Sequence, residues 1–275
     1  MDVLVWGRPA ELIESPEYRG NDHLALVAAG SGLADIVQKY TYVWPSQIKE
    51  LLQIAPVVWE SFRGDGIDLG GGVGCVTSAI VQSPLVSSVL CLELVENAVR
   101  LCQPIVFSEL DETQRAKVSS VLGDFDHLEV ESATFDFAVM WDSLHHSADP
   151  VVTLREARRV LKPGGRLIII DRVHDDAVPD EEIERMLDVE YFVEFKRSNF
   201  MDEDQVLTRR MNGEHEWRFR EMRSFIVESG LRIIDMVGFV SNERALGNDF
   251  GCPEILHRVD LGGFIKKKFA IVCSR

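Results

Sequence analysis

A glycine-rich turn is the stretch of this sequence whose residue types point most directly to chemistry. Residues 66–74 read GIDLGGGVG, a short apolar run that ends in a turn. The glycines of the turn are Gly70, Gly71, Gly72 and Gly74. Glycine has no Cβ, so a bound molecule can lie directly against the backbone. We therefore expect a ligand to contact this turn.

Two common nucleotide-binding loops do not match the turn. A triphosphate-binding loop requires lysine and then serine or threonine after its last glycine, whereas Gly74 is followed by Cys-Val-Thr. The dinucleotide fingerprint is Gly-x-Gly-x-x-Gly, and its last glycine would fall on Cys75 or Thr77. The spacing present is Asp-x-Gly-x-Gly-x-Gly, from Asp68 to Gly74. A nicotinamide-dependent oxidoreductase is therefore disfavoured.

Histidines and carboxylates form a second group of candidate residues. A histidine ionises near neutral pH and can take a proton from a hydroxyl group, and a carboxylate can orient its ring. The candidates that follow the later apolar runs are Asp142, His145, His146, Asp171 and His174. His215, in the motif GEHEW, is a reserve candidate. The five cysteines show no spacing typical of metal ligands, and we predict no metal site.

Short apolar runs alternate with helical patterns from residue 65 onward, which predicts the elements that position these residues. The predicted strands are 66–69, 88–94, 117–123, 135–141, 166–171, 231–240 and 264–273. The predicted helices are 74–83, 95–109, 150–162 and 217–229. This alternation implies parallel strands joined by right-handed crossovers. Because no helix separates the last two strands, the final strand is expected to be antiparallel. The predicted fold is α/β, an open doubly wound sheet of seven mostly parallel strands.

The chain divides into three predicted parts. Residues 1–63 show helical spacing of apolar residues over 22–40 and 46–62, and they are interpreted as an N-terminal helical cap. Residues 64–275 form the core. Within it, residues 172–214 are an insertion that includes an aromatic-rich helix over 186–200. An insertion beside the carboxyl ends of strands is well placed to cover a substrate, and we expect a lid.

Composition and charge exclude several classes of function. The 275 residues are 46% hydrophobic, with no uninterrupted apolar run of membrane-spanning length and no signal-peptide pattern. We therefore expect a cytoplasmic protein. The net charge of −16 disfavours nucleic acid and anionic membranes as partners because binding would work against repulsion. The only basic run, at 266–268, lies in a predicted strand and is interpreted as a solvated strand edge.

Four motifs in order resemble the class I S-adenosylmethionine-dependent methyltransferases over residues 64–172. They are the Asp68–Gly74 turn, VLCLELVENAV with Glu93, GDFDHL with Asp124, and residues 132–171, which match the small-molecule branch called type 11. The resemblance implies a Rossmann-like fold and S-adenosylmethionine as the cofactor. It implies that Glu93 holds the ribose hydroxyls, that Asp124 contacts the adenine amino group and that the turn lies against the methionine portion. The other residues it places beside the cofactor are Leu94, Phe125 and Trp141.

The resemblance also implies a small-molecule acceptor. Methylases of nucleic-acid bases typically carry Asn-Pro-Pro-Tyr or Asp-Pro-Pro-Tyr after the fourth strand, where this chain reads WDSLHH. In related O-methyltransferases a histidine of Leu-His-His pairs with an aspartate that ends the fifth strand. The residues here are His145 or His146, and Asp171. We therefore expect O-methylation with a histidine base, and His215 remains in reserve.

Three alternatives remain open on the sequence. The Leu-His-His element also occurs in members of the branch with carbon acceptors, where it braces the loop, so C-methylation of a quinone-like ring is the first. A module that binds the cofactor without turnover is the second. The insertion and the N-terminal helices can also serve as packing or dimer surfaces, so a homodimer is the third. The identity of the acceptor is not determined by these patterns.

Overall fold

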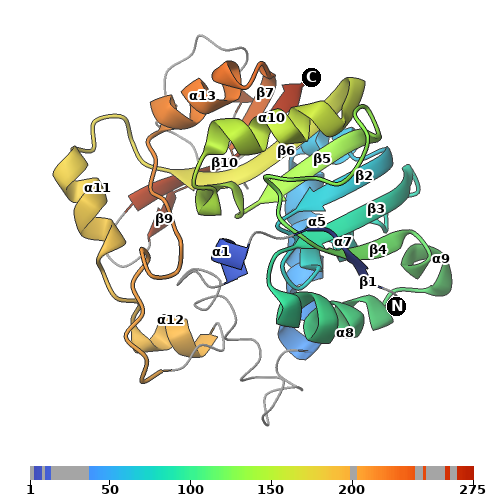
Figure 1. The fold of residues 1–275 in the computed structure, drawn as a ribbon, viewed down its shortest axis with the longest axis horizontal. Coiled ribbons are helices and arrows are strands. Elements are labelled where there is room, and N and C mark those ends of the chain that lie inside the picture. Colours follow the sequence, from blue (N-terminus) through green and yellow to red (C-terminus); the bar gives the residue numbers. More distant parts are fainter. Residues whose placement is uncertain are drawn as a thin grey trace.

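The computed structural model describes residues 3–7, 10–13, 37–198, 203–238, 244–245, 258–260 and 265–275. In these residues ten strands form one sheet, ordered β1-β4-β3-β2-β5-β6-β10-β7-β8, and β9 pairs with β10 (Figure 1). The strands are β1 (Val3–Val5), β2 (Gly64–Leu69), β3 (Val86–Glu93), β4 (Val118–Leu122), β5 (Phe135–Trp141), β6 (Leu161–Val173), β7 (Arg232–Gly238), β8 (Arg244–Ala245), β9 (Arg258–Asp260) and β10 (Ile265–Ser274).

The α/β sheet expected from the sequence is confirmed. All seven predicted strands are present, as β2 to β7 and β10. Strands β2 to β6 run parallel, and β10 lies between β6 and β7, antiparallel to both. The predicted number of seven strands was too low, because the described sheet also contains β1, β8 and β9. Each of these has only two or three residues, too few to show an alternating pattern.

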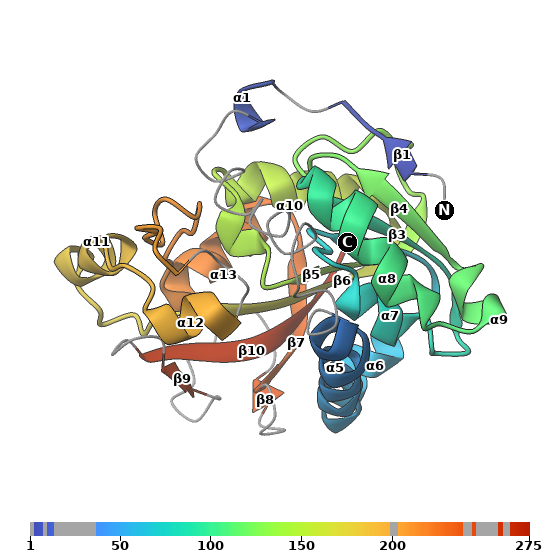
Figure 2. The same ribbon diagram turned by 90° about the horizontal axis from the view of Figure 1, so that it is seen from below.

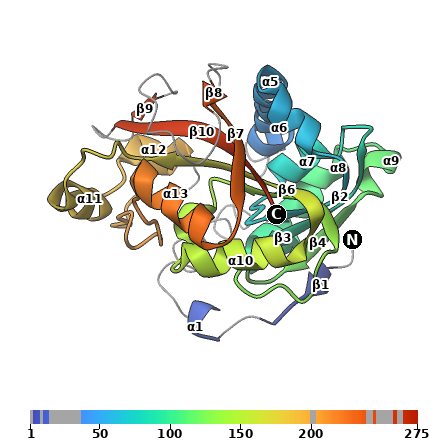
Figure 3. The ribbon, with the colours of Figure 1, turned by 90° about the horizontal axis from the view of Figure 1, so that it is seen from above.

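Helices cover both faces of the sheet. One face carries α5 (Trp44–Ile54), α6 (Pro56–Ser61), α7 (Cys75–Ile80) and α8 (Gln103–Ser108). The other carries α10 (Pro150–Val160) and α13 (Phe219–Glu228) (Figure 3). Strand residues alternate between the two cores because successive side chains point to opposite faces. On β5, for example, Phe137 and Val139 belong to the first core and Ala138 and Met140 to the second.

Two predicted helices on the first face are each split by a proline. The pattern over 46–62 forms α5 and then α6, which begins at Pro56. The pattern over 95–109 forms a π-helical turn, η2 (Ala98–Cys102), followed by α8, which has Pro104 in its first turn. Proline lacks an N–H and is favoured at the start of a helix. A second π-helical segment, η1 (Val37–Val43), precedes α5, and residues 22–36 of the predicted helix 22–40 lie outside the described residues.

The aromatic-rich helix predicted over 186–200 is wrong. Helix α11 (Asp180–Leu187) ends near its start, and α12 (Val193–Ser198) covers only its second half. Between them the Tyr191 N–H donates to the Leu207 carbonyl at 3.0 Å. The buried Lys196 Nζ donates to Glu190 at 2.7 Å and to the Gln205 carbonyl at 2.6 Å. These hydrogen bonds connect the segment to residues 205–207 and stabilise this arrangement over the continuous helix that its apolar spacing predicts.

The insertion lies beyond the carboxyl end of β6, where α11 and α12 stand away from the main sheet (Figure 2). Its small apolar cluster contains Ile183 and Met186 with Val178 and Val189 packed against them. The expected lid role stays a prediction, as do the boundaries at 63 and 64.

Strand β1 pairs with β4, so residues 3–5 belong to the sheet. Short helices complete the described elements: α1 (Ala10–Ile13), α9 (Glu112–Arg115) and the 3-10 turn η3 (Leu144–His146). Among the described residues, none of the helices has the length and apolar character needed to cross a membrane.

Candidate active site

The candidate residues meet at one edge of the sheet. The glycine turn follows β2, Glu93 ends β3 and Asp124 follows β4. The Leu-His-His turn η3 follows β5, and Asp171 lies near the end of β6. The carboxyl ends of parallel strands share an edge, which is where open α/β sheets bind their ligands. The fold therefore brings together two groups that are about 70 residues apart in the sequence.

The glycine turn is close-packed on one side and open at Gly72. A Cβ on Gly70 would lie 2.6 Å from Ser143 Cβ, so no side chain fits there. Gly72 has a φ of +53°, and no atom lies within 4 Å of the position its Cβ would take. Among the glycines of this turn, Gly72 alone therefore combines a left-handed backbone with free space at the position of a side chain.

The Gly72 peptide is held on both sides. Its N–H donates to Glu93 Oε2 at 2.9 Å, and its carbonyl accepts from Gln103 Nε2 at 2.9 Å. Gln103 is fully buried, and its side chain also lies 3.4 Å from Cys91 Sγ. We did not predict Gln103 from the sequence. The signal that could have identified it is an amide side chain within an apolar helical pattern, because an amide that is buried requires hydrogen-bond partners.

Asp68 carries a carboxylate oxygen without a partner. Its Oδ2 accepts from Thr77 Oγ1 at 2.7 Å, whereas Oδ1 is buried and has no hydrogen-bond partner among the described residues. Burial, together with the nearby Glu93, raises the pKa of Asp68 to about 7. An orphan oxygen of this kind is suited to accept from a cationic donor. The ammonium group in the methionine portion of S-adenosylmethionine has that chemistry.

Glu93 and Asp124 also fit the expected cofactor. Glu93 Oε1 accepts from the Val95 N–H at 2.8 Å. Burial raises the pKa of Glu93, although its hydrogen bonds from backbone N–H groups act in the opposite direction. Each carboxylate oxygen has a second lone pair that can accept from a ribose hydroxyl. Asp124 Oδ1 accepts from the Asp126 N–H at 2.9 Å, and burial raises the pKa of Asp124. Phe125 lies beside the turn at Gly70. Leu94, next to Glu93, is half-buried.

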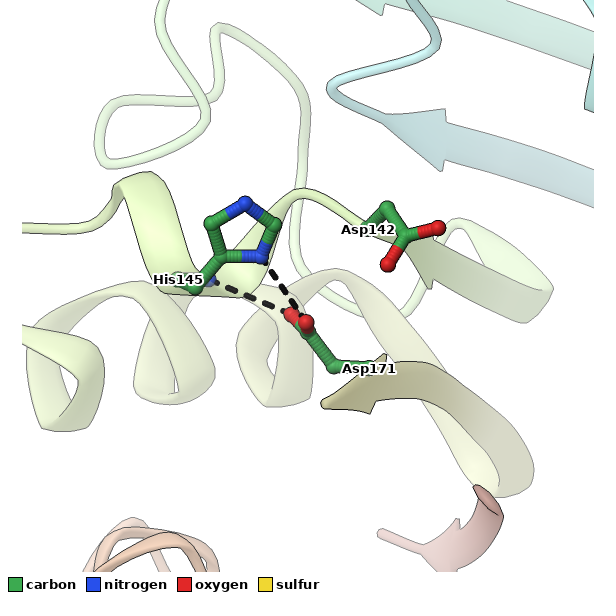
Figure 4. Close-up of side chains that lie close together, drawn as sticks. All are labelled: Asp142, His145 and Asp171. Carbon is green, nitrogen blue, oxygen red and sulfur yellow. Dashed lines mark hydrogen bonds and ion pairs between the residues drawn. The ribbon is translucent and has the colours of Figure 1, made fainter. Parts of the chain in front are cut away.

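His145 and Asp171 form a buried pair (Figure 4). His145 Nδ1 lies 2.8 Å from Asp171 Oδ1, and the His145 backbone N–H donates to Oδ2 at 3.2 Å. Burial alone would raise the pKa of Asp171, but the adjacent His145 outweighs it and the pKa is lowered. An ionised carboxylate only accepts, so the proton on the His145 ring is assigned to Nδ1. The second ring nitrogen, Nε2, is then the acceptor.

Two cations complete this part of the site. Arg172 Nη2 lies 3.4 Å from His145 Nε2, and a guanidinium only donates, which agrees with the assigned tautomer. Asp142 pairs with Lys268 at 2.6 Å and with Arg172 at 3.2 Å. Burial would raise the pKa of Asp142, but Lys268 and Arg172 hold it well below its usual range. Asp142, His145 and Asp171 are types that bind metals, but here the two carboxylates are balanced by two cations.

Lys268 corrects one interpretation of the sequence. Its side chain is 15% exposed and pairs with Asp142, so it is not part of a solvated strand edge. The register of β10 against β6 sets Lys268 opposite Arg172. Lys268 Nζ also lies 5.8 Å from the centre of the Trp141 ring, which ends β5. Arg172 and Lys268 were both missed as site residues, since no local pattern links the two strands.

The other predicted histidines have different surroundings. His146 Nδ1 donates to the Gly213 carbonyl at 3.1 Å, and its ring lies 4.4 Å from that of His145. Burial and His145 lower the pKa of His146 to about 4, so this ring is neutral at pH 7. The His215 backbone N–H and Nδ1 both donate to the His145 carbonyl, at 2.8 Å and 3.1 Å. His174 is fully buried and donates to Glu216 instead.

Comparison with known proteins agrees with this geometry. Residues 67–169 match the sequence model of a family described as a methyltransferase domain. A protein from Pyrenophora dematioidea named O-methyltransferase is 30% identical over 116 residues, which are 42% of each chain. An uncharacterised 37.1 kDa protein in transposon TN4556 of Streptomyces fradiae is 34% identical over 127 residues. That match covers 43% of this chain and 34% of the relative, so the chain spans about a third of this curated relative.

Solved structures share the fold at low sequence identity. A methyltransferase of Leishmania major has a TM-score of 0.56 at 14% identity, over 93% of this chain and 82% of that one. Geranyl diphosphate C-methyltransferase of Streptomyces coelicolor has a TM-score of 0.56 at 12% identity, over 84% and 75%. The family match, the glycine turn and the acids Glu93 and Asp124 at the strand ends agree with one another: residues 67–169 are similar to the class I S-adenosylmethionine-dependent methyltransferase domains of the type 11 branch.

Proposed function

We propose that this protein transfers the methyl group of S-adenosylmethionine to a hydroxyl group of a small molecule, with His145 as the general base. The observation that carries the proposal is the buried His145–Asp171 pair at the carboxyl edge of the sheet, with Nε2 left as the acceptor. This edge also holds the glycine turn. The Pyrenophora relative named O-methyltransferase supports an oxygen acceptor.

The proposed reaction is an in-line displacement. When bound, the cofactor supplies an electrophilic methyl group on a sulfonium. Asp68, Glu93 and Asp124 would hold its amino acid, ribose and adenine portions. His145 Nε2 would take the proton of the acceptor hydroxyl, whose oxygen would receive the methyl group, with S-adenosylhomocysteine as the other product. Asp171 stabilises the imidazolium that results. A general base of this kind contributes about 10²- to 10⁴-fold in rate.

Arg172 enters the proposed mechanism as the group that the acceptor displaces. Its Nη2 faces His145 Nε2 in this structure, so an incoming hydroxyl must take over that position. Asp142 remains close enough to keep the guanidinium paired. The cations Arg172 and Lys268 balance the carboxylates Asp142 and Asp171, which favours an uncharged acceptor over an ionic one.

A screen with methyl-labelled cofactor tests the proposal. Hydroxylated aromatic compounds and sugars are offered separately, and the release of S-adenosylhomocysteine and the position of the label are measured. With an accepted compound, His145→Gln and Asp171→Asn should lower single-turnover rates by about two to four orders of magnitude. The control variant Glu112→Gln changes an exposed residue of α9, which precedes β4 and so lies toward the opposite edge of the sheet, and it should keep the wild-type rate.

Each alternative outcome has a meaning. A label on carbon identifies C-methylation. A protein that binds the cofactor and releases no product with any acceptor matches a module without turnover. Near wild-type rates in His145→Gln and Asp171→Asn would reject the base and leave alignment of the two reactants as the source of catalysis.

A further inference from the structure

A segment at the end of the insertion is bonded directly to the two histidines. Residues 213–217, here called the strap, make three hydrogen bonds with η3. The His215 N–H and Nδ1 donate to the His145 carbonyl, and the Gly213 carbonyl accepts from His146 Nδ1. The strap therefore fixes the loop at His145 and selects the protonated nitrogen of His146.

The other side of the strap is anchored in a buried network of charges. The carboxylates of Glu214 and Glu216 do not bond to η3 in the described hydrogen bonds but meet Arg209. Arg209 Nη1 donates to Glu214 Oε2 at 3.1 Å and to Glu216 Oε1 at 3.2 Å. The side chains of Arg209, Glu214 and Glu216 are at most 8% exposed.

Two neighbouring residues complete the network. His174 Nε2 donates to Glu216 Oε2 at 2.7 Å, and the Tyr191 hydroxyl donates to Glu214 Oε1. Both residues are buried. His174 lies at the start of the insertion, Tyr191 in its middle and Arg209 and Glu214 at its end, so the network joins all three parts of that segment.

General energetics argue against stability as the purpose of this network. Removing charges from water is costly, and apolar residues of similar size often stabilise a protein as well or better. In the part of the insertion that the structure describes, a small apolar cluster forms around Ile183 and Met186. A buried ionic network does, however, define one geometry, because each donor must meet its acceptor. The geometry defined here is the placement of the strap.

We propose that Arg209 is a positioning residue of the active site, which seats the strap and through it sets the tautomer of His146 and the orientation of the His145 loop. Its catalytic meaning rests on the proposed function. Burial of His146 keeps its ring neutral at pH 7, so a proton fixed on Nδ1 leaves Nε2 as an acceptor. Both histidines of the element then offer Nε2 as an acceptor.

Nitrogen NMR of histidine rings tests this proposal without an acceptor. The protein is labelled with ¹⁵N-histidine and saturated with S-adenosylhomocysteine, and His145→Gln and His146→Gln assign the signals. The main variant is Arg209→Met with Glu214→Gln and Glu216→Gln, which removes all three charges of the network. We expect the wild-type His146 signals to report a proton on Nδ1 and the variant to show both tautomers. His145 should keep its tautomer, because Asp171 still fixes it.

Two further variants sharpen the comparison. Arg210→Met is the matched control, since Arg210 is the adjacent arginine and pairs with Glu184 and Asp188 on the surface. It should leave both histidines unchanged. Arg209→Lys keeps a donor between the two glutamates and should retain most of the wild-type tautomer. If the triple variant fails to fold, Glu214→Gln with Glu216→Gln provides the same test.

Unchanged His146 signals in a folded triple or double variant would overturn the proposal. So would a loss of the tautomer in Arg210→Met, because the effect would then not depend on the buried network. The result is separable from the proposed function: ring nitrogens report the tautomer whether or not a hydroxyl acceptor exists, and a failed acceptor screen leaves the NMR result intact.

Discussion

Asp68→Asn should stabilise the free protein and weaken cofactor binding at the same time. The Asp68 carboxylate is buried with one oxygen unpartnered, and its pKa is raised by burial from 3.8 to about 7. Asparagine has the same shape without the charge. It can still accept from Thr77, but it cannot offer a carboxylate to an ammonium group.

The sign and size of the stability effect follow from proton linkage. Between pH 3.8 and about 7 the folded state binds more protons at Asp68 than the unfolded state, so the free energy of unfolding falls as pH rises through this window. A difference of about 3 between the two pKa values corresponds to roughly 4 kcal/mol at about 1.4 kcal/mol per unit. Asparagine does not titrate, so the variant does not lose stability in this way as the pH rises. Its advantage should be small near pH 4 and reach a few kcal/mol above pH 7.

Urea denaturation at pH 5 and pH 8 measures the first effect, and calorimetric titration with S-adenosylhomocysteine measures the second. We expect the free energies of unfolding of wild type and variant to diverge toward pH 8 and the affinity of the variant to fall at least tenfold. Parallel stabilities at the two pH values would show that the Asp68 pKa is not raised. An unchanged affinity would show that the orphan oxygen does not contact the ligand.

Two further predictions concern the glycine turn. Gly72→Val should remove S-adenosylhomocysteine binding from a protein that still folds, because the side chain fills the open space at a left-handed φ; Gly164→Val, at a similar φ of +80° with equally open surroundings, is the matched control and should bind normally. Gln103→Leu should weaken binding about fivefold through the lost bond to the Gly72 carbonyl, in line with about 1 kcal/mol for such a bond. Gln82→Leu, a glutamine bonded to Lys49 and Ser78 instead, should leave the calorimetric affinity as it is, and equal losses in the two variants would contradict the role of Gln103.

The parts of the site that follow single strands could be predicted from the sequence. The glycine turn, Glu93, Asp124, the histidines and Asp171 each stand at the end of an apolar run, and parallel strands bring those ends to one edge. Residues that depend on the pairing of distant strands could not be predicted. Lys268 meets Asp142 only through the register of β10 on β6, and a shift by one residue would turn it to the other face.

Local patterns also failed where buried polar contacts decide the structure. The segment 186–200 has the spacing of a helix, but the buried Lys196 and the bond from Tyr191 to Leu207 bend it back on itself. Gln103 resembles any polar residue within a helix, and its two contacts come from β3 and the glycine turn. The network around Arg209 likewise joins residues from separate parts of the insertion. Periodicity carries no information on such contacts.

The position of β10 has a consequence for how the protein is made. This strand follows both of its neighbours in the chain, yet it lies between them. During synthesis, β6 can pair with β5, but β7 cannot join the sheet until residues 265–274 have left the ribosome, and the edge of β6 that faces away from β5 stays unpaired until then. The same strand brings Lys268 to Asp142. Closure of the sheet and charge balance in the active site therefore occur in one late step, and a nascent chain that stalls before it exposes an aggregation-prone edge and leaves Asp142 without its Lys268 partner.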